Sequence, residues 1–441
     1  MTGEKTFNRW LVVLGALLIQ VSLGAVYIYS VFKPGLAKVF PAWKPTDLAL
    51  PSQVILAFFA LSTIFAGRIQ DKVGPKIVAT VGGILLGLGL FLASRATDLM
   101  TFTLSFAVLG GIGIGAAYVC PIATCVKWFP DKRGLITGLA VAGFGAGALI
   151  FAPVAKSLIA SSGIMVTFMY LGGIFFITVV IGAQLMVNPP AGYKPAGWNP
   201  LAATAGSSAA SADLTWSEML KTRQFWLLWL TYFAGCTAGL MIIMNVMNIW
   251  QSFSMLNLSS LLPTVPKASF DDIITKGTMA VMIVSILNAC GRIVWGKISD
   301  SIGRKTTLYI IFAYCGVIML LLNSMSSFAL FLFGAASVGF TFGGYLGLYP
   351  AFTADYFGTK NVGVNYGFMF TAYGAGGLFG PWLAPKLMEV VKKASYEALD
   401  KGVTTIKAFD IGNYLQAFII AGIMCLVSIA LIWMVKPLKN S

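Results

Sequence analysis

The sequence has 441 residues, of which 58% are hydrophobic and only 10% are charged. Soluble globular proteins carry about 25% charged residues, so this composition excludes an ordinary soluble protein and indicates a chain embedded in a lipid bilayer. The formal net charge is +15. Because the basic residues are spread over many short segments, we expect contact with anionic membrane lipid and no nucleic-acid partner.

Twelve apolar stretches follow one another along the chain, each long enough to cross a hydrocarbon core about 30 Å thick as a helix. They lie near residues 10–32, 50–70, 77–96, 100–128, 134–160, 164–187, 224–254, 275–299, 305–323, 328–356, 362–388 and 411–435. The first stretch is too long for the core of a signal peptide, so we expect it to be retained. Lys and Arg favour the loops on the side of the two termini, which predicts cytoplasmic termini. The predicted fold is an all-α membrane protein with twelve transmembrane helices.

One loop motif occurs twice. GRIQDKVGPK at 67–76, between the second and third stretches, is repeated half a chain later as GKISDSIGRK at 296–305. WFPDKRG at 128–134 is echoed by YFGTKNVG at 356–363 with nearly the same offset. A period this long indicates two similar halves rather than a solenoid. We therefore expect pseudo-symmetric six-helix halves at 1–187 and 224–441.

Each copy of the loop motif carries an aspartate and a basic residue. Asp71 and Asp300 are suited to cap the next element or to pair with a nearby cation, and the glycines permit close packing and a tight turn. We expect these loops, with Lys76 and Arg304 as their basic residues, to stabilise one closed conformation.

Two longer connections complete the chain. Residues 188–223 are rich in Pro, Ala, Ser and Gly, which predicts a mobile cytoplasmic linker with a short amphipathic piece at 215–221. Residues 389–410 are rich in charge and predict an external loop that is partly helical.

Arg292 is a charged residue deep inside a predicted span. It lies eight residues before Asp300, about 12 Å along a helix and therefore near the middle of the bilayer. A cation at that depth costs about 2.5 to 3.5 kcal/mol. Two interpretations stay open: a side chain that reaches down to the interface, or an anion receptor, since guanidinium binds a carboxylate through two parallel hydrogen bonds. Asn288, one turn earlier on the same face, would add an amide.

Other polar side chains accompany Arg292 in the spans. Tyrosines stand where a hydroxyl needs a polar partner: Tyr27, Tyr29, Tyr118, Tyr345, Tyr349 and Tyr373. Together with Arg292 they predict a site for a small, anionic and partly apolar molecule. Lys156 and Lys386 stand near the external ends of two spans, where attraction of anions into an open mouth and anchoring at the membrane edge are both consistent with their positions.

The chain has no histidine, and its six cysteines all lie in apolar stretches. We therefore expect no disulfide framework and no zinc at Cys120 and Cys125. The spans offer no paired carboxylates, so we expect no enzyme and no cofactor. Three other classes fit the sequence less well. A receptor built on a transporter scaffold would normally show an added soluble domain. A sugar carrier would have amides in its binding site and a cationic-drug carrier would have carboxylates in the membrane, whereas the buried charge here is positive.

These features resemble the major facilitator superfamily, in which two six-span halves carry GxxxDxxGxK loops. More narrowly, NRW at 8–10, WFPDKRG at 128–134, NYGF at 365–368 and the single Arg292 are similar to the oxalate:formate antiporter branch and its monocarboxylate transporter relatives. The resemblance implies a central site lined by Tyr27, Tyr118, Arg292, Phe342, Phe370 and Tyr373, to which we add Asn288 and Tyr345 from their positions.

Two departures from the family pattern refine this expectation. Oxalate carriers of the branch place a second cation, a lysine, where this chain has Tyr373 by approximate alignment. One cation suits a monoanion, because a second unpaired carboxylate would be buried at a cost of several kcal/mol. Animal monocarboxylate transporters, which are proton symporters, have an aspartate one turn before the arginine and a lysine in span one. Here Asn288 and Tyr27 take those places.

The resemblance thus implies a monomeric secondary active transporter of lactate-, pyruvate- or acetate-like monocarboxylates in the cell membrane. Alternating access between the two halves and proton symport are the expected mechanism. The alternatives are exchange of organic anions of the oxalate:formate type and facilitated passage of another small solute.

Overall fold

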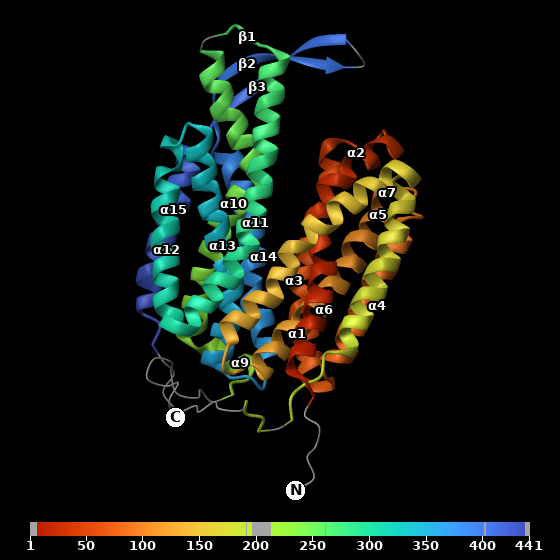
Figure 1. The fold of residues 1–441 in the computed structure, drawn as a ribbon, viewed down its shortest axis with the longest axis vertical. Helices are drawn as coiled ribbons and strands as arrows, with labels where there is room; N and C mark the ends of the chain where they lie inside the picture. The colour runs from red at the N-terminus through yellow and green to blue at the C-terminus, as the bar shows by residue number, and fades with distance from the viewer. Residues whose placement is uncertain (1–6, 191, 196–212, 261, 401–402, 437–441) are drawn as a thin grey trace.

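The computed structural model describes residues 7–190, 192–195, 213–260, 262–400 and 403–436. They form two helical bundles that stand side by side (Figure 1). Along the chain, the first bundle precedes and the second follows residues 188–223, the segment predicted as a mobile linker. Residues 191 and 196–212 of this segment lie outside the described residues. The amphipathic piece expected at 215–221 is a short helix, α9 (Trp216–Lys221), capped by Thr215.

The first bundle contains the predicted spans one to six. Its elements are α1 (Arg9–Leu23), η1 (Gly24–Ile28), α2 (Tyr29–Val39), α3 (Pro45–Val73), α4 (Pro75–Ala93), α5 (Leu99–Phe102), η2 (Thr103–Leu109), α6 (Gly110–Trp128) and α7 (Arg133–Gln184). The elements α1, η1 and α2 follow one another without a break, as do α5, η2 and α6. α7 holds two predicted spans, because Gly163 at φ 77° lets the backbone turn between two helical segments.

The second bundle contains spans seven to twelve. Its helices are α10 (Arg223–Ser259), α11 (Lys267–Ile302), α12 (Arg304–Leu321), η3 (Leu322–Ser324), α13 (Phe328–Phe357), α14 (Val362–Leu387) and α15 (Leu415–Trp433). Thr222 and Ser327 accept hydrogen bonds from the first turns of α10 and α13, as expected of helix N-caps.

The duplicated loop motif has the same backbone conformation in both bundles. Gly74 ends α3 at φ 95°, and Gly303, its counterpart in the second copy, ends α11 at φ 89°. Each is followed at once by the next helix, α4 or α12. Since a side chain strains a backbone in this region of φ, the glycine of the motif is required by the turn itself.

The expectation of an all-α fold is corrected by a small sheet. The segment 389–410 was expected to be partly helical. Its described residues instead lie in two antiparallel strands, β2 (Glu389–Asp400) and β3 (Val403–Asn413), and β1 (Thr264–Val265) pairs with β2 in parallel. The reason is β propensity: the valine pair at 390–391 and the run VTTI at 403–406 are β-branched. The chain is therefore mostly helical with a three-stranded sheet, in the order β1-β2-β3.

Ten helices of the described residues are long and apolar enough to cross a membrane. The number is smaller than the twelve predicted spans for two reasons: α7 joins two of them, and α14, which has 26 residues, is not among the ten. By composition and helix length the chain is a multi-pass membrane protein.

The two ends of the bundles differ. The described chain ends and α9 lie at one end, called here the linker end, whereas the β-sheet lies at the other, the sheet end (Figure 1). The ribbons of the two bundles meet at the linker end and diverge toward the sheet end (Figure 1).

Candidate functional site

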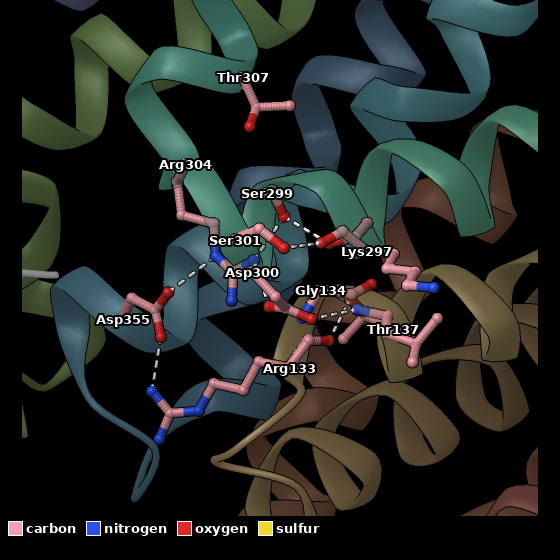
Figure 2. Close-up of polar contacts among 12 residues, drawn as sticks. Arg133, Gly134, Thr137, Lys297, Ser299, Asp300, Ser301, Arg304, Thr307 and Asp355 are labelled. Atoms are coloured by element: carbon pink, nitrogen blue, oxygen red, sulfur yellow. Dashed lines mark hydrogen bonds and ion pairs between the residues drawn. The ribbon is translucent and has the colours of Figure 1, made fainter. Parts of the chain in front are cut away.

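At the linker end, Asp300 of α11 caps a helix of the opposite bundle (Figure 2). Its carboxylate accepts hydrogen bonds from the backbone N–H groups of Gly134 at 2.9 Å and Leu135 at 2.8 Å, in the first turn of α7. These N–H groups have no partner within the helix, and the positive end of the helix dipole favours a negative charge there. Asp300 thus holds the start of α7 against α11.

Asp71 of α3 makes the equivalent contact at the start of α14. Its carboxylate accepts hydrogen bonds from the backbone N–H groups of Gly363 at 3.3 Å and Val364 at 2.9 Å. Asp71 and Asp300 hold the same position in the two copies of the loop motif, and Gly134 and Gly363 are separated by the same offset. The two contacts, called here the α7–α11 joint and the α3–α14 joint, are therefore two copies of one arrangement.

Glycines make the close approach at both joints possible. Gly296 of α11 lies against Gly134 of α7, and Gly67 of α3 lies against Gly363 of α14, so that a Cβ at any of these glycines would collide with atoms of the opposite bundle. The first glycine of the repeated loop motif is thus explained by a contact between the bundles.

Charged side chains surround the joints unequally. Arg304 pairs with Asp300 at 2.6 Å and with Asp355 at 3.0 Å, and Asp355 also pairs across the bundles with Arg133 at 2.5 Å (Figure 2). At the α3–α14 joint the ion pair is Lys127 with Asp71, at 3.6 Å. Lys76 is exposed and makes no ion pair with any residue that the structure describes. Sequence reasoning anticipated a cation near Asp300, which is Arg304, but it missed Lys127, Arg133 and Asp355. A signal was visible, because Lys127 and Asp355 directly precede the two copies of the second repeated motif.

Arg292 lies between the bundles, about two turns of α11 from Asp300, and its exposed fraction is 0%. Its Nη1 donates to the backbone carbonyl of Val141 in α7 at 2.6 Å, and its Nε donates to Oδ1 of Asn288 at 3.3 Å. Nη2 has no hydrogen-bond partner within the described residues. A buried guanidinium edge that is left unpaired costs free energy, so this edge is suited to bind an acceptor that comes from outside the chain.

Glycines of the neighbouring helices leave room for Arg292. A Cβ at Gly138 of α7 or at Gly347 of α13 would collide with the backbone carbonyl oxygen of Arg292. A Cβ at Gly145 of α7 would lie 3.3 Å from Cζ of the Arg292 guanidinium. The glycine-rich faces of α7 and α13 therefore fix the backbone of Arg292 and leave space beside its charged group.

A pocket surrounds the guanidinium and contains about 160 Å³ of empty space. It is lined by Tyr27, Phe59, Tyr118, Phe144, Arg292, Leu346, Phe370 and Tyr373. The hydroxyls of Tyr27 and Tyr373 lie 2.6 Å apart and join the two bundles by a hydrogen bond. Phe370 stacks on Tyr373, with ring centroids 4.6 Å apart. This empty space is divided among gaps between side chains that are each too narrow for a water molecule, so a ligand requires the lining side chains to move apart.

The arrangement of two bundles around a buried central residue is matched by a known family. The sequence profile of the Major Facilitator Superfamily matches residues 7–381 and 251–441. The chain belongs to the major facilitator superfamily. It is therefore a multi-pass membrane transporter and not an enzyme.

Relatives within the superfamily cover most of the chain. YhjX of Escherichia coli (strain K12), an uncharacterized MFS-type transporter, is 31% identical over 84% of this chain and 86% of its own length. The oxalate:formate antiporter of Oxalobacter formigenes is 28% identical over 86% of this chain and 85% of its own length. Monocarboxylate transporter 12 of Rattus norvegicus is 24% identical over 98% and 86%. The resemblance drawn from the sequence motifs is confirmed.

Among solved structures, the major facilitator transporter FucP in the outward conformation has a similar fold. The TM-score is 0.63 at 16% sequence identity, and the match covers 97% of this chain and 99% of that chain. At this identity the similarity concerns the fold alone.

The structure of this major facilitator transporter brings most of the predicted site residues together. Tyr27, Tyr118, Arg292, Phe370 and Tyr373 line the pocket, and Asn288 contacts Arg292. Three further lining residues, Phe59, Phe144 and Leu346, were not predicted. Of these, Phe144 had a signal in the sequence, because it precedes Gly145, whose counterpart Gly374 keeps the offset of the loop motif.

Phe342 and Tyr345 lie away from the pocket, in the interior of the second bundle. The ring of Phe342 packs on Gly239 of α10, and Tyr345 packs on Gly235 and on Phe312 of α12, with ring centroids 4.6 Å apart. On α13 it is Leu346 that lines the pocket. Helix rotation turns Tyr345 by about 100° from Leu346. Phe342 lies one turn, about 6 Å, away along the helix, where its ring packs on Gly239.

The remaining predicted side chains include the two lysines at the sheet end and the six cysteines, of which Cys290 is exposed and the others are buried. Lys156 and Lys386 are both exposed, and only Lys156 borders a second pocket, with Ser30, Val31, Pro34, Ile159 and Ala160. The six cysteines are free, and the described residues contain no group of three or more side chains suited to hold a metal ion.

Proposed function

We propose that this transporter carries small monocarboxylates, such as lactate, pyruvate or acetate, by secondary active transport. One observation carries the proposal: Arg292 is fully buried between the bundles, and its Nη2 has no partner within the described residues. In this proposal a carboxylate accepts from Nη2 and takes the place of the Val141 carbonyl at Nη1, which gives the two parallel hydrogen bonds that guanidinium offers.

The lining of the pocket supports a monoanion with a small organic part. Arg292 is the one cation among the eight residues that line it, and no acid is among them. Tyr27 and Tyr373 offer hydroxyls, while Phe59, Phe144 and Phe370 offer apolar walls. A dianion would leave one carboxylate without a partner in a buried site, at a cost of several kcal/mol.

The two joints support an alternating-access mechanism. They hold the bundles together at the linker end, whereas the bundles diverge at the sheet end (Figure 1). We propose that the halves 1–187 and 224–441 rock about the central pocket, that the linker end with both termini faces the cytoplasm, and that the joints stabilise the state open to the outside of the cell membrane.

Proton symport is the proposed coupling, with a single copy of the chain as the transporting unit. Since no acid lines the pocket, the proposal requires that the proton bind elsewhere or travel on the substrate. An inside-alkaline pH gradient across proteoliposomes should then accelerate uptake, and an unaffected initial rate contradicts symport.

The test of the proposed function is uptake of labelled lactate into proteoliposomes by the Arg292→Lys variant. Lysine keeps the charge but loses the planar fork, so we expect uptake to fall by about 100-fold, the loss of close to 3 kcal/mol of bidentate binding. Arg95→Lys is the matched control, because Arg95 is an exposed arginine that stacks near Phe91 far from the pocket. Full uptake by Arg292→Lys would show that the bidentate contact is not used.

A screen by thermal shift identifies the acid that is carried. Only a ligand that binds the folded state raises its melting temperature, so lactate, pyruvate, acetate, formate and oxalate can be ranked on the purified protein. Exchange of organic anions is the second candidate function, because the oxalate:formate antiporter is a relative over most of this chain. A response to oxalate stronger than to lactate would favour it.

A further inference from the structure

A second pocket lies at the sheet end of the first bundle, outside the central site. Ser30, Val31 and Pro34 of α2 form one wall, and Lys156, Ile159 and Ala160 of α7 form the other. The pocket contains about 750 Å³ of empty space, including its open mouth. Its lining is mostly apolar, with one ammonium group and one hydroxyl.

The pocket lies on the wall that leads to Arg292. Gly145 of α7 faces the guanidinium, since a Cβ there would lie 3.3 Å from Cζ. Lys156 follows Gly145 by eleven residues, which is three turns and about 16 Å on the same face of the helix. On the other wall, Val31 follows Tyr27, a residue of the central pocket, by about one turn. The second pocket and the central pocket thus share one face of the first bundle.

Lys156 has a charge that the surrounding structure does not neutralise. It makes no ion pair with any residue in the described ranges, and no acid lines its pocket. The acids of α11 near this end are already paired on their own helix: Asp271 with Lys267 at 2.6 Å and Asp272 with Lys276 at 2.7 Å. An ammonium beside a concave apolar surface is a ready partner for an anion that carries a short organic tail.

We propose that this pocket is an outer binding site, at which a small monocarboxylate rests before it moves to Arg292. Lys156 and the hydroxyl of Ser30 bind the carboxylate, and Pro34 and Ile159 contact the organic part. The inference rests on the proposed function for its ligand class. It separates the two sheet-end lysines, because Lys386 does not line the pocket.

Binding is tested first without transport, by the rate at which a thiol reagent modifies the Ala160→Cys variant. Ala160 is exposed and lines the pocket, and it offers no polar group to the carboxylate. In the full chain in proteoliposomes, sodium lactate should slow this reaction about threefold or more, as expected for a weak site that excludes the reagent when occupied. Adding Lys156→Gln should abolish the protection, whereas adding Arg292→Lys should leave it intact. Cys290 is exposed in the native chain, so its modification is measured without Ala160→Cys and subtracted.

Transport gives the second readout, with a matched loss of charge. Lys156→Gln should lower kcat/KM for lactate about fivefold at low ionic strength, and the difference should shrink at high salt because exposed charges are screened. Lys386→Gln removes one positive charge from the same end and should change kcat/KM less than twofold, as expected for steering by net charge alone.

The outcomes separate this inference from the proposed function. If lactate protects Ala160→Cys while the wild type transports no lactate, the proposed function fails and the outer site stands. No protection, protection that vanishes with Arg292→Lys, or equal losses for Lys156→Gln and Lys386→Gln would each overturn the outer site, whatever the uptake by the wild type.

Discussion

The strongest test of the joints is the substitution Asp300→Asn. Asp300 binds the first turn of α7 through two backbone hydrogen bonds, at 2.9 and 2.8 Å, and pairs with Arg304 at 2.6 Å. Asparagine has nearly the same shape but no charge, and its amide nitrogen cannot accept a hydrogen bond. One backbone N–H of α7 therefore loses its acceptor, and the helix terminus loses its counter-charge.

The magnitude follows from these contacts. Hydrogen bonds to charged groups contribute about 1.5 to 3 kcal/mol and neutral ones about 0.5 to 1.5 kcal/mol, so the substitution should destabilise the closed linker end by about 1.5 to 2 kcal/mol. That corresponds to a change of roughly 10- to 30-fold in the ratio of open to closed linker ends. If the linker end is closed in about 99% of wild-type molecules, the fraction with an open linker end should rise from about a hundredth to about a tenth to a fifth in Asp300→Asn.

The assay is a distance measurement between spin labels on the two copies of the loop motif. Val73→Cys and Ile302→Cys are suitable sites, because both side chains are about half exposed and end α3 and α11 at equivalent positions. Double electron–electron resonance should show a longer-distance population that grows in Asp300→Asn. Asp98→Asn is the control, since Asp98 caps α5 within its own bundle. A distance distribution that is identical to that of the wild type would refute the joint as a stabiliser of the closed end.

Two further predictions concern the pocket. Gly145→Ala should press a Cβ against the guanidinium of Arg292. The weakened contact, about 1 kcal/mol, should raise KM for lactate roughly fivefold. The melting temperature should not fall, because alanine favours the helix. Gly173→Ala on the same helix meets open space and should leave KM unchanged, and equal KM values in both variants would contradict the argument. Tyr373→Lys should place a second cation in the pocket and raise the preference for oxalate over lactate about tenfold or more. An unchanged ratio of the two uptake rates would show that the number of cations does not select the substrate.

The sequence was sufficient for the helices because hydrophobic length and duplication are both local signals. The apolar stretches needed only counting, and the constant offset between the halves related the loops that end in Gly74 and Gly303. The strand pair of β2 and β3 was missed because its charged residues suggested a loop, whereas its β-branched residues and the pairing with β1 decide the structure.

The site was predicted in part because burial of a charge is visible in a sequence, while rotation of a helix is not. Arg292 stands out in an apolar span, and the structure shows it fully buried. Which face of α13 meets the pocket depends on its packing against α10 and α12, so Leu346 lines the pocket and Tyr345 packs inside the bundle. The backbone N–H groups that donate to Asp71 and Asp300 also required the structure, because they lie in the opposite bundle.

The duplication explains why a single arginine is enough to define the site. At the offset that relates Asp71 to Asp300, the counterpart of Arg292 in the first half is Thr63. Both residues pack through their backbone carbonyls on a glycine of the opposite bundle, Gly138 for Arg292 and Gly367 for Thr63. The backbone contact is therefore repeated and the side chain is not. Packing between the bundles is preserved by the glycines, whereas the charge is placed on one side only.

This asymmetry connects the pocket to the α7–α11 joint. Asp300 holds Gly134 at the start of α7, and two turns further along α7 the carbonyl of Val141 accepts a hydrogen bond from Arg292. Both contacts fix the same helix against α11. In the proposed mechanism a carboxylate that takes Nη1 from Val141 removes one of them, so binding of the substrate weakens the closed linker end by up to one charge-assisted hydrogen bond, about 1.5 to 3 kcal/mol. Release of substrate restores that contact, which couples occupancy of Arg292 to the conformation of the two bundles without requiring a second charged residue in the pocket.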